Sequence, residues 1–437
     1  MVGLVHGRTP PREPMTDSYL PRVIEAELAD VFSGVAALSI EGAKAVGKTA
    51  TALRSAETIF RLNRAADRDL FGASSPTLGD LATPVLLDEW QRYPESWEIV
   101  KDSVDDDPTP GRFLLTGSAT PLDRTTHSGA GRIVVVRMRP LSLYERRIDT
   151  ATVSLADLLS GRQTEIGGTA AVGIQEYVAE ILSSGFPGIR ALRGRAQQAQ
   201  MAGYIARIVD HDLPELGFNV RHPQTLARWL TAYAAASSTT AKYEQIRDAA
   251  TAGEGEKPAK TTSIAYRSVL EKLWIIEEVP AWLPTRNVFG RLSAPPKHHL
   301  VDPALAASLL GATEQTLTGQ STAHGNQASV LVGRLFESLV TQSIRVYAQH
   351  NQATVHHLRT WSGDREIDLI VERADGAVLA VEVKLSEHVT DHDVRHLRWL
   401  KSRIGDDLVD AVVVTAGSRA YRRPDGIAVC PAALLMP

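Results

Sequence analysis

One eight-residue stretch near the start of the chain has the residue types and spacing needed to hold phosphate. It reads Gly42-Ala43-Lys44-Ala45-Val46-Gly47-Lys48-Thr49 and matches the P-loop pattern G-x-x-x-x-G-K-[ST]. The glycines let backbone N–H groups turn toward a phosphate, Lys48 reaches the β- and γ-phosphates, and Thr49 is a ligand for Mg²⁺. A plain glycine-rich turn is the alternative, but the strand and helix predicted on either side favour an ATP site.

A second element of a nucleotide site follows about forty residues later. Val85-Leu86-Leu87-Asp88-Glu89 is an apolar strand that ends in two acids, as in a Walker B element. Asp88 would hold Mg²⁺ through water, and Glu89 would orient or deprotonate the water that attacks the γ-phosphate. Adjacent acids at a strand end are otherwise usually solvated, and it is their place after the P-loop that favours the catalytic interpretation.

Two further positions are candidates for contact with the transferred phosphate. The next apolar segment ends in Thr116-Gly117-Ser118, so Ser118 or Thr116 would sense the γ-phosphate, with a plain turn as the alternative. Arg132 is a candidate arginine finger for a neighbouring subunit, because an arginine supplied in trans stabilises the charge of the transition state. A surface role is the commoner one for such an arginine.

The last hundred residues carry a second set of polar groups. Glu337 lies on a predicted helix, Asp368 near the start of a strand, and Glu382-Val383-Lys384 on the next strand. Strand alternation puts Glu382 and Lys384 on one face, where acid and amine converge. Asp368 and Glu382, with the Val383 carbonyl, would hold Mg²⁺ or Mn²⁺, and Glu337 would support the metal through water. Lys384 would position or deprotonate a hydrolytic water.

Some of these signals have plainer explanations. Glu-x-Lys alone is what any half-exposed strand shows, and only the whole order of helix acid, strand acid and strand acid–lysine strengthens it. His388, His392 and His396 recur every four residues, which would align them on one face of a following helix. A zinc site is one interpretation, but the Asp and Arg residues among them favour a solvated or DNA-facing helix.

The elements that position these groups divide the chain into three predicted domains. Residues 1–150 alternate strands at 35–40, 84–87, 112–115 and 133–136 with a helix at 49–62, the α/β pattern of a parallel sheet. Residues 151–327 read as mainly helical, with helices at 175–182, 198–209 and 223–235. Residues 328–437 return to α/β structure, with a helix at 329–349 and strands at 367–372, 378–383 and 410–414.

Composition places the chain among ordinary soluble proteins. It has 437 residues, 43% of them apolar, and a formal charge of −4, which excludes disordered and fibrous classes and limits any DNA contact to a local groove. The single cysteine, Cys430, fits a reducing cytoplasm. No apolar run approaches the roughly 18 residues that span a bilayer, and the first residues lack a signal-peptide stretch. We therefore expect a cytoplasmic protein without a membrane partner.

The motifs together resemble a known family. GAKAVGKT, LLDEWQRYPE, FLLTGSA and GRIVVVRMRPLSLYE, within residues 17–146, look like the AAA-type ATPases of bacteria and archaea that carry a C-terminal domain of unknown function. The resemblance continues through Ser184-Gly185-Phe186-Pro187-Gly188 and His299-Leu300-Val301-Asp302-Pro303. The family's loop usually reads GPRQVGKT, so Ala43 and Ala45 differ at variable positions. The acid and lysine set of residues 328–437 resembles the PD-(D/E)xK nucleases, which implies a restriction-endonuclease-like fold there.

The resemblance also implies a winged-helix-like element in the middle domain. Helices at 243–250 and 263–273 and a strand at 274–279 are similar to a helix-turn-helix and its wing, with Arg267 and Lys272 on the recognition helix. The connector 251–262 is much longer than the usual turn, and a winged helix is as often a packing module as a DNA reader.

The sequence thus predicts an ATP-hydrolysing protein that cuts nucleic acid, with DNA as the expected partner, through a Mg²⁺- or Mn²⁺-dependent C-terminal site. The alternative is an ATP-driven switch whose C-terminal domain binds DNA or a protein without cleaving. A helicase is a weaker interpretation, because no further helicase motif set is present. Assembly as a homo-oligomer is implied by the family resemblance alone.

Overall fold

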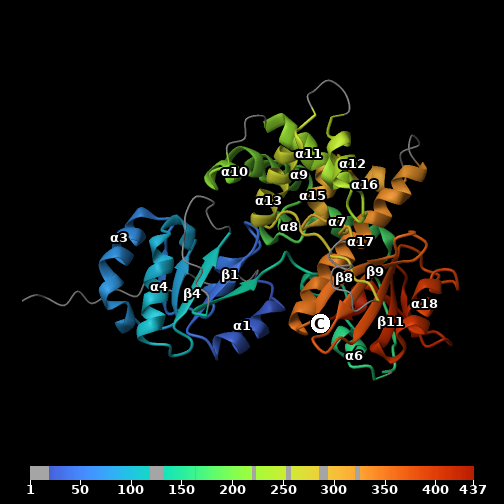
Figure 1. The fold of residues 1–437 in the computed structure, drawn as a ribbon, viewed down its shortest axis with the longest axis horizontal. Helices are drawn as coiled ribbons and strands as arrows, with labels where there is room; N and C mark the ends of the chain where they lie inside the picture. The colour runs from blue at the N-terminus through green and yellow to red at the C-terminus, as the bar shows by residue number, and fades with distance from the viewer. Residues whose placement is uncertain are drawn as a thin grey trace, which may run out of the picture. The chain divides into compact units, whose positions relative to one another are not determined.

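The computed structural model describes residues 19–118, 131–162, 164–218, 223–251, 257–284, 294–319 and 325–437 (Figure 1). It divides into two compact units. Among the described residues, the first unit comprises 19–42, 47–118 and 131–138, and the second comprises 43–46 and the residues from 139 onward. The three domains expected from the sequence remain a prediction.

The first unit is built on a five-stranded sheet in which every strand pair is parallel. The order of its strands is β2 (Thr58–Arg61), β3 (Val85–Asp88), β4 (Phe113–Gly117), β1 (Ala37–Glu41) and β5 (Ile133–Arg137). Parallel strands are buried on both faces, which explains their nearly unbroken apolar runs. Four of these strands confirm the sequence predictions to within two residues at each end.

Helices cover both faces of this sheet (Figure 1). Alternate residues of β4 point to opposite sides: Phe113 and Leu115 pack with α3 (Ala65–Ser74) and α4 (Glu95–Asp106), whereas Leu114 faces α1 (Ile24–Phe32). The core on the α3 and α4 side is rich in aromatic rings, and Trp90 lies against Trp97 with ring centroids 4.6 Å apart. This core holds the strands in place, and the polar residues of the candidate site lie at the ends of those strands.

The helix predicted at 49–62 is wrong beyond its first turn. The structure has a short helix, α2 (Lys48–Ala52), followed by strand β2 (Thr58–Arg61) paired in parallel with β3. Thr58, Ile59 and Phe60 are β-branched or aromatic residues, which favour a pleated and half-buried surface over a helix. Thr58–Arg61 forms a strand because it pairs with β3. The local sequence does not show such pairing with a distant segment.

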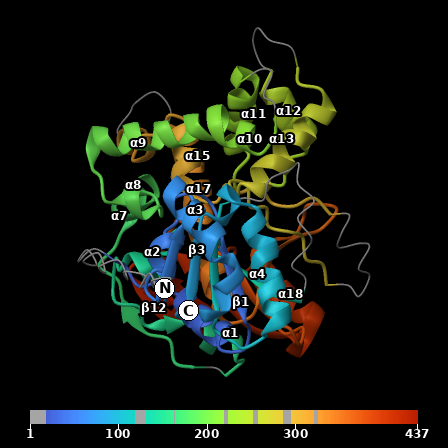
Figure 2. The same ribbon diagram turned by 90° about the vertical axis from the view of Figure 1, so that its left-hand side faces the viewer.

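The second unit begins with a helical region. Its helices are α5 (Leu143–Arg146), α6 (Leu155–Leu159), α7 (Ile174–Ser183), α8 (Pro187–Arg190), α9 (Gly194–Arg207), α10 (Leu213–Glu215), α11 (Pro223–Ala235), α12 (Tyr243–Ala249), α13 (Lys260–Lys272), α15 (Pro303–Leu309) and α16 (Glu314–Leu317). The long α9 contacts α8 and α15 (Figure 2). The helices expected at 175–182, 198–209 and 223–235 are confirmed.

The expected helix-turn-helix and wing are present only in part. Helices α12 and α13 occupy the predicted positions, while part of their connector, 252–256, lies outside the described residues. The strand expected at 274–279 is wrong, because these residues make only isolated antiparallel bridges, Ile276 with Leu300 and Val279 with Lys297. The bridges nevertheless hold the segment that contains Lys297 alongside residues 276–279.

The rest of the second unit is a seven-stranded mixed sheet. Its order is β7 (Gly168–Thr169), β12 (Arg419–Arg422), β13 (Ala428–Pro431), β11 (Leu408–Thr415), β10 (Val378–Lys384), β9 (Glu366–Glu372) and β8 (Thr354–Arg359). A small separate pair joins β6 (Val153–Ser154) to β14 (Leu435–Met436). Helix α17 (Gly325–His350) lies against β8 to β10, and α18 (Arg395–Ile404) against β9 to β11. The helix and three strands predicted here are confirmed.

The histidine repeat does not form a helical face. Helix α18 begins at Arg395, so His388 and His392 lie in the preceding turns and only His396 is helical. Thr390 donates to the Asp393 carboxylate from both its N–H and its hydroxyl, at 2.8 and 2.7 Å, which stabilises that turn. No helix among the described residues is long and apolar enough to cross a membrane.

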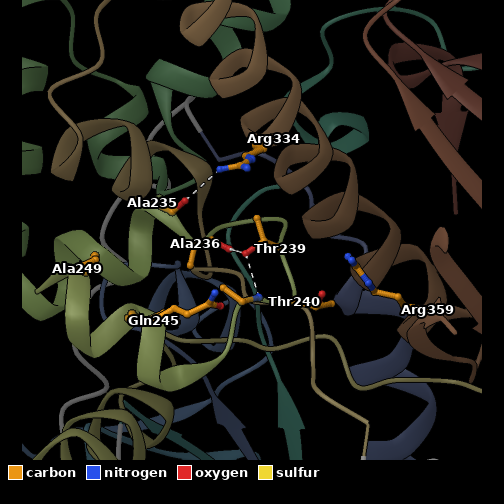
Figure 3. A pocket seen from close by; sticks show the side chains of 11 residues that line it. Ala235, Ala236, Thr239, Thr240, Gln245, Ala249, Arg334 and Arg359 are labelled. Atoms are coloured by element: carbon orange, nitrogen blue, oxygen red, sulfur yellow. Dashed lines mark hydrogen bonds between the residues drawn. The ribbon is translucent and has the colours of Figure 1, made fainter. Parts of the chain in front are cut away.

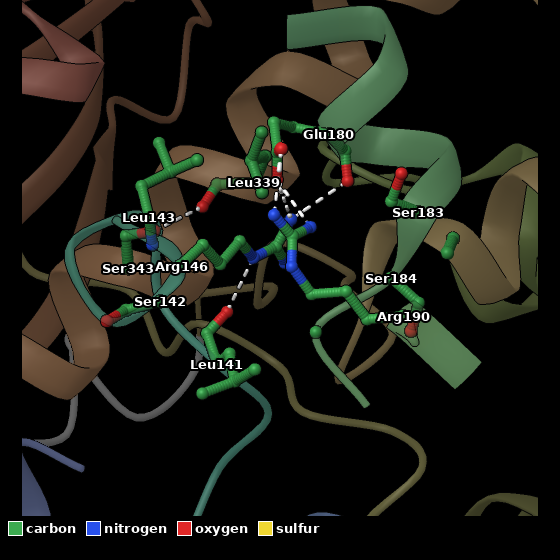
Figure 4. Close-up of polar contacts among 12 residues, drawn as sticks. Leu141, Ser142, Leu143, Arg146, Glu180, Ser183, Ser184, Arg190, Leu339 and Ser343 are labelled. Carbon is green, nitrogen blue, oxygen red and sulfur yellow. Dashed lines mark hydrogen bonds and ion pairs between the residues drawn. The ribbon is translucent and has the colours of Figure 1, made fainter. Parts of the chain in front are cut away.

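Arg146, at the end of α5, is a buried polar centre of the second unit (Figure 4). Its guanidinium donates to the carbonyls of Leu141 and Glu180 at 2.9 and 2.8 Å, to the Glu180 carboxylate at 3.2 Å and to the Gln342 amide oxygen at 3.3 Å. Arg190 holds the same carboxylate through two bonds of 2.7 and 2.9 Å. The segment that follows β5 in the chain is therefore joined to α7 and α17.

Candidate functional site

The parallel sheet of the first unit brings the predicted nucleotide-binding residues to one edge. Strands β1, β3 and β4 run in the same direction, so their carboxyl ends meet, and ligands of such sheets bind outside this edge. The predicted loop Gly42–Thr49 follows β1, Asp88 ends β3, and Ser118 follows β4. The loop, Asp88 and Ser118 therefore lie at the same ends of neighbouring strands, although Gly42 and Ser118 are 76 residues apart in the sequence.

The backbone of the loop adopts the left-handed conformations that a phosphate cradle requires. Gly47, which precedes α2, has φ of 105°, a value that costs glycine little and other residues much more. Ala45 also has positive φ, 67°, where an alanine is strained by roughly 1 kcal/mol. Lys48 donates to the Gly42 carbonyl at 3.0 Å and to the Ser118 hydroxyl at 3.3 Å, which brings Ser118 to the loop as predicted.

Asp88 lies at the centre of a hydroxyl network. Its Oδ1 accepts hydrogen bonds of 2.6 Å from the hydroxyls of both Thr49 and Thr116. Thr116 also accepts from the Glu89 N–H at 3.1 Å. Adjacent hydroxyl and carboxylate oxygens are the hard ligands that Mg²⁺ prefers, with the nucleotide phosphates and water completing its shell. Thr49 and Asp88 therefore fit the metal of an ATP complex.

Glu89 is held in an unusual backbone conformation. Its φ and ψ are 58° and 49°, a left-handed conformation that a glutamate adopts only when its surroundings enforce it, and such positions cluster at functional sites. Its carboxylate accepts a hydrogen bond of 2.6 Å from the Gln91 amide. A Cβ at Gly117 would lie 2.5 Å from Trp90 Nε1, so the glycine of Thr116-Gly117-Ser118 makes room for the turn that follows Glu89.

Arg132 lies near the amino-terminal ends of the strands, opposite to the ends that carry the P-loop. It immediately precedes β5, which pairs in parallel with β1 from Ala37 to Glu41, so it is near the amino ends of the strands, whereas the P-loop is at the carboxyl ends. Its side chain is 43% exposed and donates to Asp105 at 2.8 Å. Arg132 therefore does not serve the site of its own unit, and the arginine finger in trans remains a prediction.

The second unit brings the predicted acids and lysine of the C-terminal region together. Lys384 Nζ is 2.7 Å from Glu382 Oε1, which confirms that strand alternation puts both on one face. Asp368, on neighbouring β9, accepts a hydrogen bond of 2.9 Å from the Val383 N–H. A cavity of about 230 Å³ opens on this face and is lined by Glu366, Asp368, Glu382, Lys384, His392, Asp393, Arg395 and His396.

A fully buried lysine that the sequence patterns did not indicate enters this cluster. Lys297 Nζ is 2.8 Å from Glu337 Oε1, 3.1 Å from Asp368 Oδ1 and 3.6 Å from Glu366 Oε1. Its side chain is 1% exposed. Lys297 is 40 residues from Glu337 and 71 from Asp368 in sequence, and no motif spacing joins it to either. It belongs to the segment bridged to residues 276–279.

The ionisation of the cluster follows from burial and from its two lysines. Burial raises the pKa of Glu337 to about 8, against the attraction of Lys297. Burial and the neighbouring Asp368 raise the pKa of Glu382 to about 8. Burial alone would raise the pKa of Asp368, but Lys297, Lys384 and the Val383 N–H hold it below its usual value. Of these three carboxyl groups, Asp368 is the one whose ionised form its neighbours favour.

These residues do not fit a divalent metal ion as they stand. Glu337 and Asp368 already accept hydrogen bonds from the Lys297 ammonium, and one oxygen of Glu382 is bonded to Lys384. The other oxygen of Glu382, Oε2, is buried without a hydrogen-bond partner. In the described part of the chain no three His, Cys, Asp or Glu side chains are arranged to hold a metal. The predicted metal pair Asp368 and Glu382 is close in space but is occupied by lysines.

A larger hollow lies in the helical region (Figure 3). It has a volume of about 570 Å³ and lies between α11, α12 and the two arginines Arg334 and Arg359. Arg334 donates to the Ala235 carbonyl at 3.4 Å. The lining is mostly alanine and threonine and holds no carboxylate or histidine. It lacks groups for general acid–base catalysis.

Comparison with known families supports the class of the first unit. Residues 35–146 match a family described as an AAA domain. Residues 174–316 and 332–435 match two families described as domains of unknown function, DUF8612 and DUF4143. The loop geometry and the match at 35–146 together support a P-loop domain of the AAA type. No nuclease family is among these matches.

Individual proteins are similar over most of the chain. Uncharacterised proteins of Mycobacterium tuberculosis (strain ATCC 25618 / H37Rv) and Mycobacterium bovis (strain ATCC BAA-935 / AF2122/97) are each 24% identical over 392 residues, which is 89% of this chain and 76% of theirs. Among solved structures, the Walker-type ATPase PABY2304 of Pyrococcus abyssi matches 67% of this chain and 96% of its own, with 17% identity and a TM-score of 0.39.

Proposed function

We propose that the protein binds ATP at the Gly42–Thr49 loop and hydrolyses its terminal phosphate. The observation that carries this proposal is that Lys48 bonds Ser118 and Thr49 bonds Asp88, both at the carboxyl ends of the strands of a parallel sheet. Each group has a part in phosphoryl transfer, and the match of residues 35–146 to an AAA domain agrees with it.

The roles follow from the positions of the side chains. Lys48 exchanges its contacts with Gly42 and Ser118 for the β- and γ-phosphate oxygens, and the N–H groups of the loop bind the same phosphates. Thr49 and Asp88 would hold Mg²⁺, which would neutralise charge that develops on the phosphates. Glu89, oriented by Gln91, accepts the proton of the attacking water. Thr116 keeps Asp88 and the Glu89 backbone in register.

Replacement of Glu89 by glutamine tests this assignment. Glu89→Gln keeps the shape of the side chain but removes the base, so we expect ATP turnover to fall by roughly 10²–10⁴-fold while nucleotide binding is retained. Steady-state phosphate release and binding of a fluorescent ATP analogue measure the two effects. Glu98→Gln is the matched control, because Glu98 lies on α4 and pairs with Lys101 at 3.2 Å. Wild-type turnover by Glu89→Gln would exclude Glu89 as the base.

For the second unit, the ATP-driven switch is the better-supported alternative. Asp368, Glu382 and Lys384 lie together, but Lys297 bonds Asp368 and Lys384 bonds Glu382, the two carboxylates that were predicted to hold the metal. Lys384 and Arg395 line the cavity beside it, and Trp361, in the turn before β9, is 77% exposed. Cations and an exposed aromatic ring are the groups that bind nucleic-acid strands. We therefore propose a nucleic-acid-binding module, with DNA as the first candidate.

A single set of DNA experiments separates binding from cleavage. We expect wild-type protein to leave supercoiled and linear DNA intact with Mg²⁺ or Mn²⁺, with and without ATP. We expect it to bind single-stranded DNA with an affinity that falls about 5- to 140-fold in Trp361→Ala, because stacking contributes about 1–3 kcal/mol per base. Cleavage that disappears in both Lys384→Ala and Glu382→Ala would instead establish a nuclease. Tyr421→Ala, which removes another exposed ring, is the control for binding.

A further inference from the structure

Lys297 lies where three acidic side chains converge from two elements. Its ammonium is within 3.6 Å of carboxylates from α17 and β9 and bonds two of them directly, Glu337 at 2.8 Å and Asp368 at 3.1 Å. Several carboxylates surround the ammonium, as several ligands surround a bound metal ion. A buried charge needs such compensation, because transfer of a lone ammonium from water into a protein interior is very costly.

The chain holds Lys297 in this place through its backbone and its neighbours. The N–H and carbonyl of Lys297 form two bonds of 2.9 Å with Val279. On one side the Pro295 carbonyl contacts the His357 ring at 3.1 Å. On the other, the ring of His299 contacts the Ser338 hydroxyl at 3.4 Å, next to Glu337 on α17. The ammonium is therefore positioned by a segment anchored on both sides.

The charges in the cluster leave little demand for a further cation. Lys297 and Lys384 supply two positive charges, and Glu337, Asp368 and Glu382 supply at most three negative ones. The charge of Glu366, the fourth acid nearby, is balanced by Arg359 at 3.1 Å. A divalent ion beside Asp368 would lie against the Lys297 ammonium, and two like charges at this separation repel strongly in a buried site.

We propose that the Lys297 ammonium is the resident cation of the C-terminal acidic cluster and takes the place of a divalent metal ion there. Lys297 comes from the region matched at 174–316, while Glu337, Asp368 and Glu382 come from the region matched at 332–435. The cluster is thus a composite of two sequence regions, and its binding face is metal-independent. Removal of the lysine charge leaves Glu337 and Asp368 without the cation that they share, and we expect Mn²⁺ or Mg²⁺ to bind in its place.

The experiment measures Mn²⁺ binding to the full chain without nucleotide, by calorimetry and by the loss of the free Mn²⁺ resonance signal. At about 1 mM Mn²⁺, a concentration at which weak cation sites in proteins fill, we expect the wild-type protein and its Asp368→Asn variant to bind the same amount of Mn²⁺. We expect Lys297→Met, which keeps the length of the side chain, to gain about one Mn²⁺ per chain. That gain disappears in Lys297→Met/Asp368→Asn.

Thermal unfolding provides a second readout that does not depend on activity. Lys297→Met leaves its carboxylates unpaired, and we expect Mn²⁺ at a hundredfold excess over Kd to raise its Tm by about 5 °C or more. Wild-type protein and Lys297→Arg, which keeps the charge, should not respond. Lys272→Met, a change on the exposed side of α13, is the matched control.

Two results would overturn the proposal. One is Mn²⁺ binding by wild-type protein that Asp368→Asn removes, because it shows that a metal coexists with Lys297. This comparison stands even where Lys297→Met does not fold. The other is folded Lys297→Met that binds no additional Mn²⁺, because the carboxylates then do not form a cation site when the ammonium is absent.

Discussion

Replacement of Lys48 by alanine is expected to lower ATP turnover by at least about 10²–10³-fold, the scale on which removal of one preorganised charge-stabilising donor acts. Lys48, the first residue of α2, donates to the Gly42 carbonyl and to the Ser118 hydroxyl. The effect should include weaker nucleotide binding, because the ammonium contacts the phosphates in the ground state as well as in the transition state.

Phosphate release and titration with a fluorescent ATP analogue measure the two parts of this effect. Lys101→Ala is the matched control, since Lys101 is on α4 and pairs with Glu98 at 3.2 Å. Comparison with Glu89→Gln adds a second contrast: Lys48→Ala should lose binding and turnover together, whereas Glu89→Gln should lose turnover alone. Unchanged ATP hydrolysis in Lys48→Ala would reject the nucleotide site altogether.

Replacement of Arg146 by methionine is expected to destabilise the second unit by about 3–5 kcal/mol, the cost of removing one partner from a buried ionic group. The Arg146 side chain is fully buried, and it donates to two backbone carbonyls, those of Leu141 and Glu180, which lose this donor in the variant. Methionine restores much of the volume, so lost polar contacts rather than a cavity would cause the change.

Arg190→Met provides the matched comparison for Arg146. Arg190 binds the same Glu180 carboxylate, but its side chain is 18% exposed and water can solvate what it leaves behind. We expect a loss of about 1 kcal/mol there, within the range of an exposed ion pair. Thermal or urea unfolding, followed by a tryptophan signal such as that of buried Trp229 in the second unit, measures both variants. Equal stabilities for the two would show that Arg146 is not the polar centre.

The two candidate sites differ in how far sequence could define them. The nucleotide site rests on a contiguous loop and on strand ends, and the rule that parallel strands end at one edge brings Asp88 and Ser118 to that loop. Its supporting contacts were less visible: the role of Thr116 beside Asp88 and the bond from Gln91 to Glu89 depend on side-chain rotamers and on a left-handed residue.

The helix expected at 49–62 shows where local pattern gives way to pairing. Residues 53–57 carry no strong signal, and the chain turns there because β3 offers an open edge to Thr58–Arg61. The histidine repeat shows the same limit. Spacing of four residues predicts one helical face, but α18 begins only at Arg395, after turns held by Asp393.

The sequence by itself determined the P-loop, the acid pair at the end of β3 and the Glu382–Lys384 face, because each depends on neighbours along one strand or one loop. Only the tertiary structure decided what the C-terminal acids do. Lys297 reaches Glu337 and Asp368 across 40 and 71 residues, through a segment whose pairing with residues 276–279 leaves no periodic signature. Long-range packing places this ammonium among the carboxylates, and its charge determines whether they are available to a metal ion.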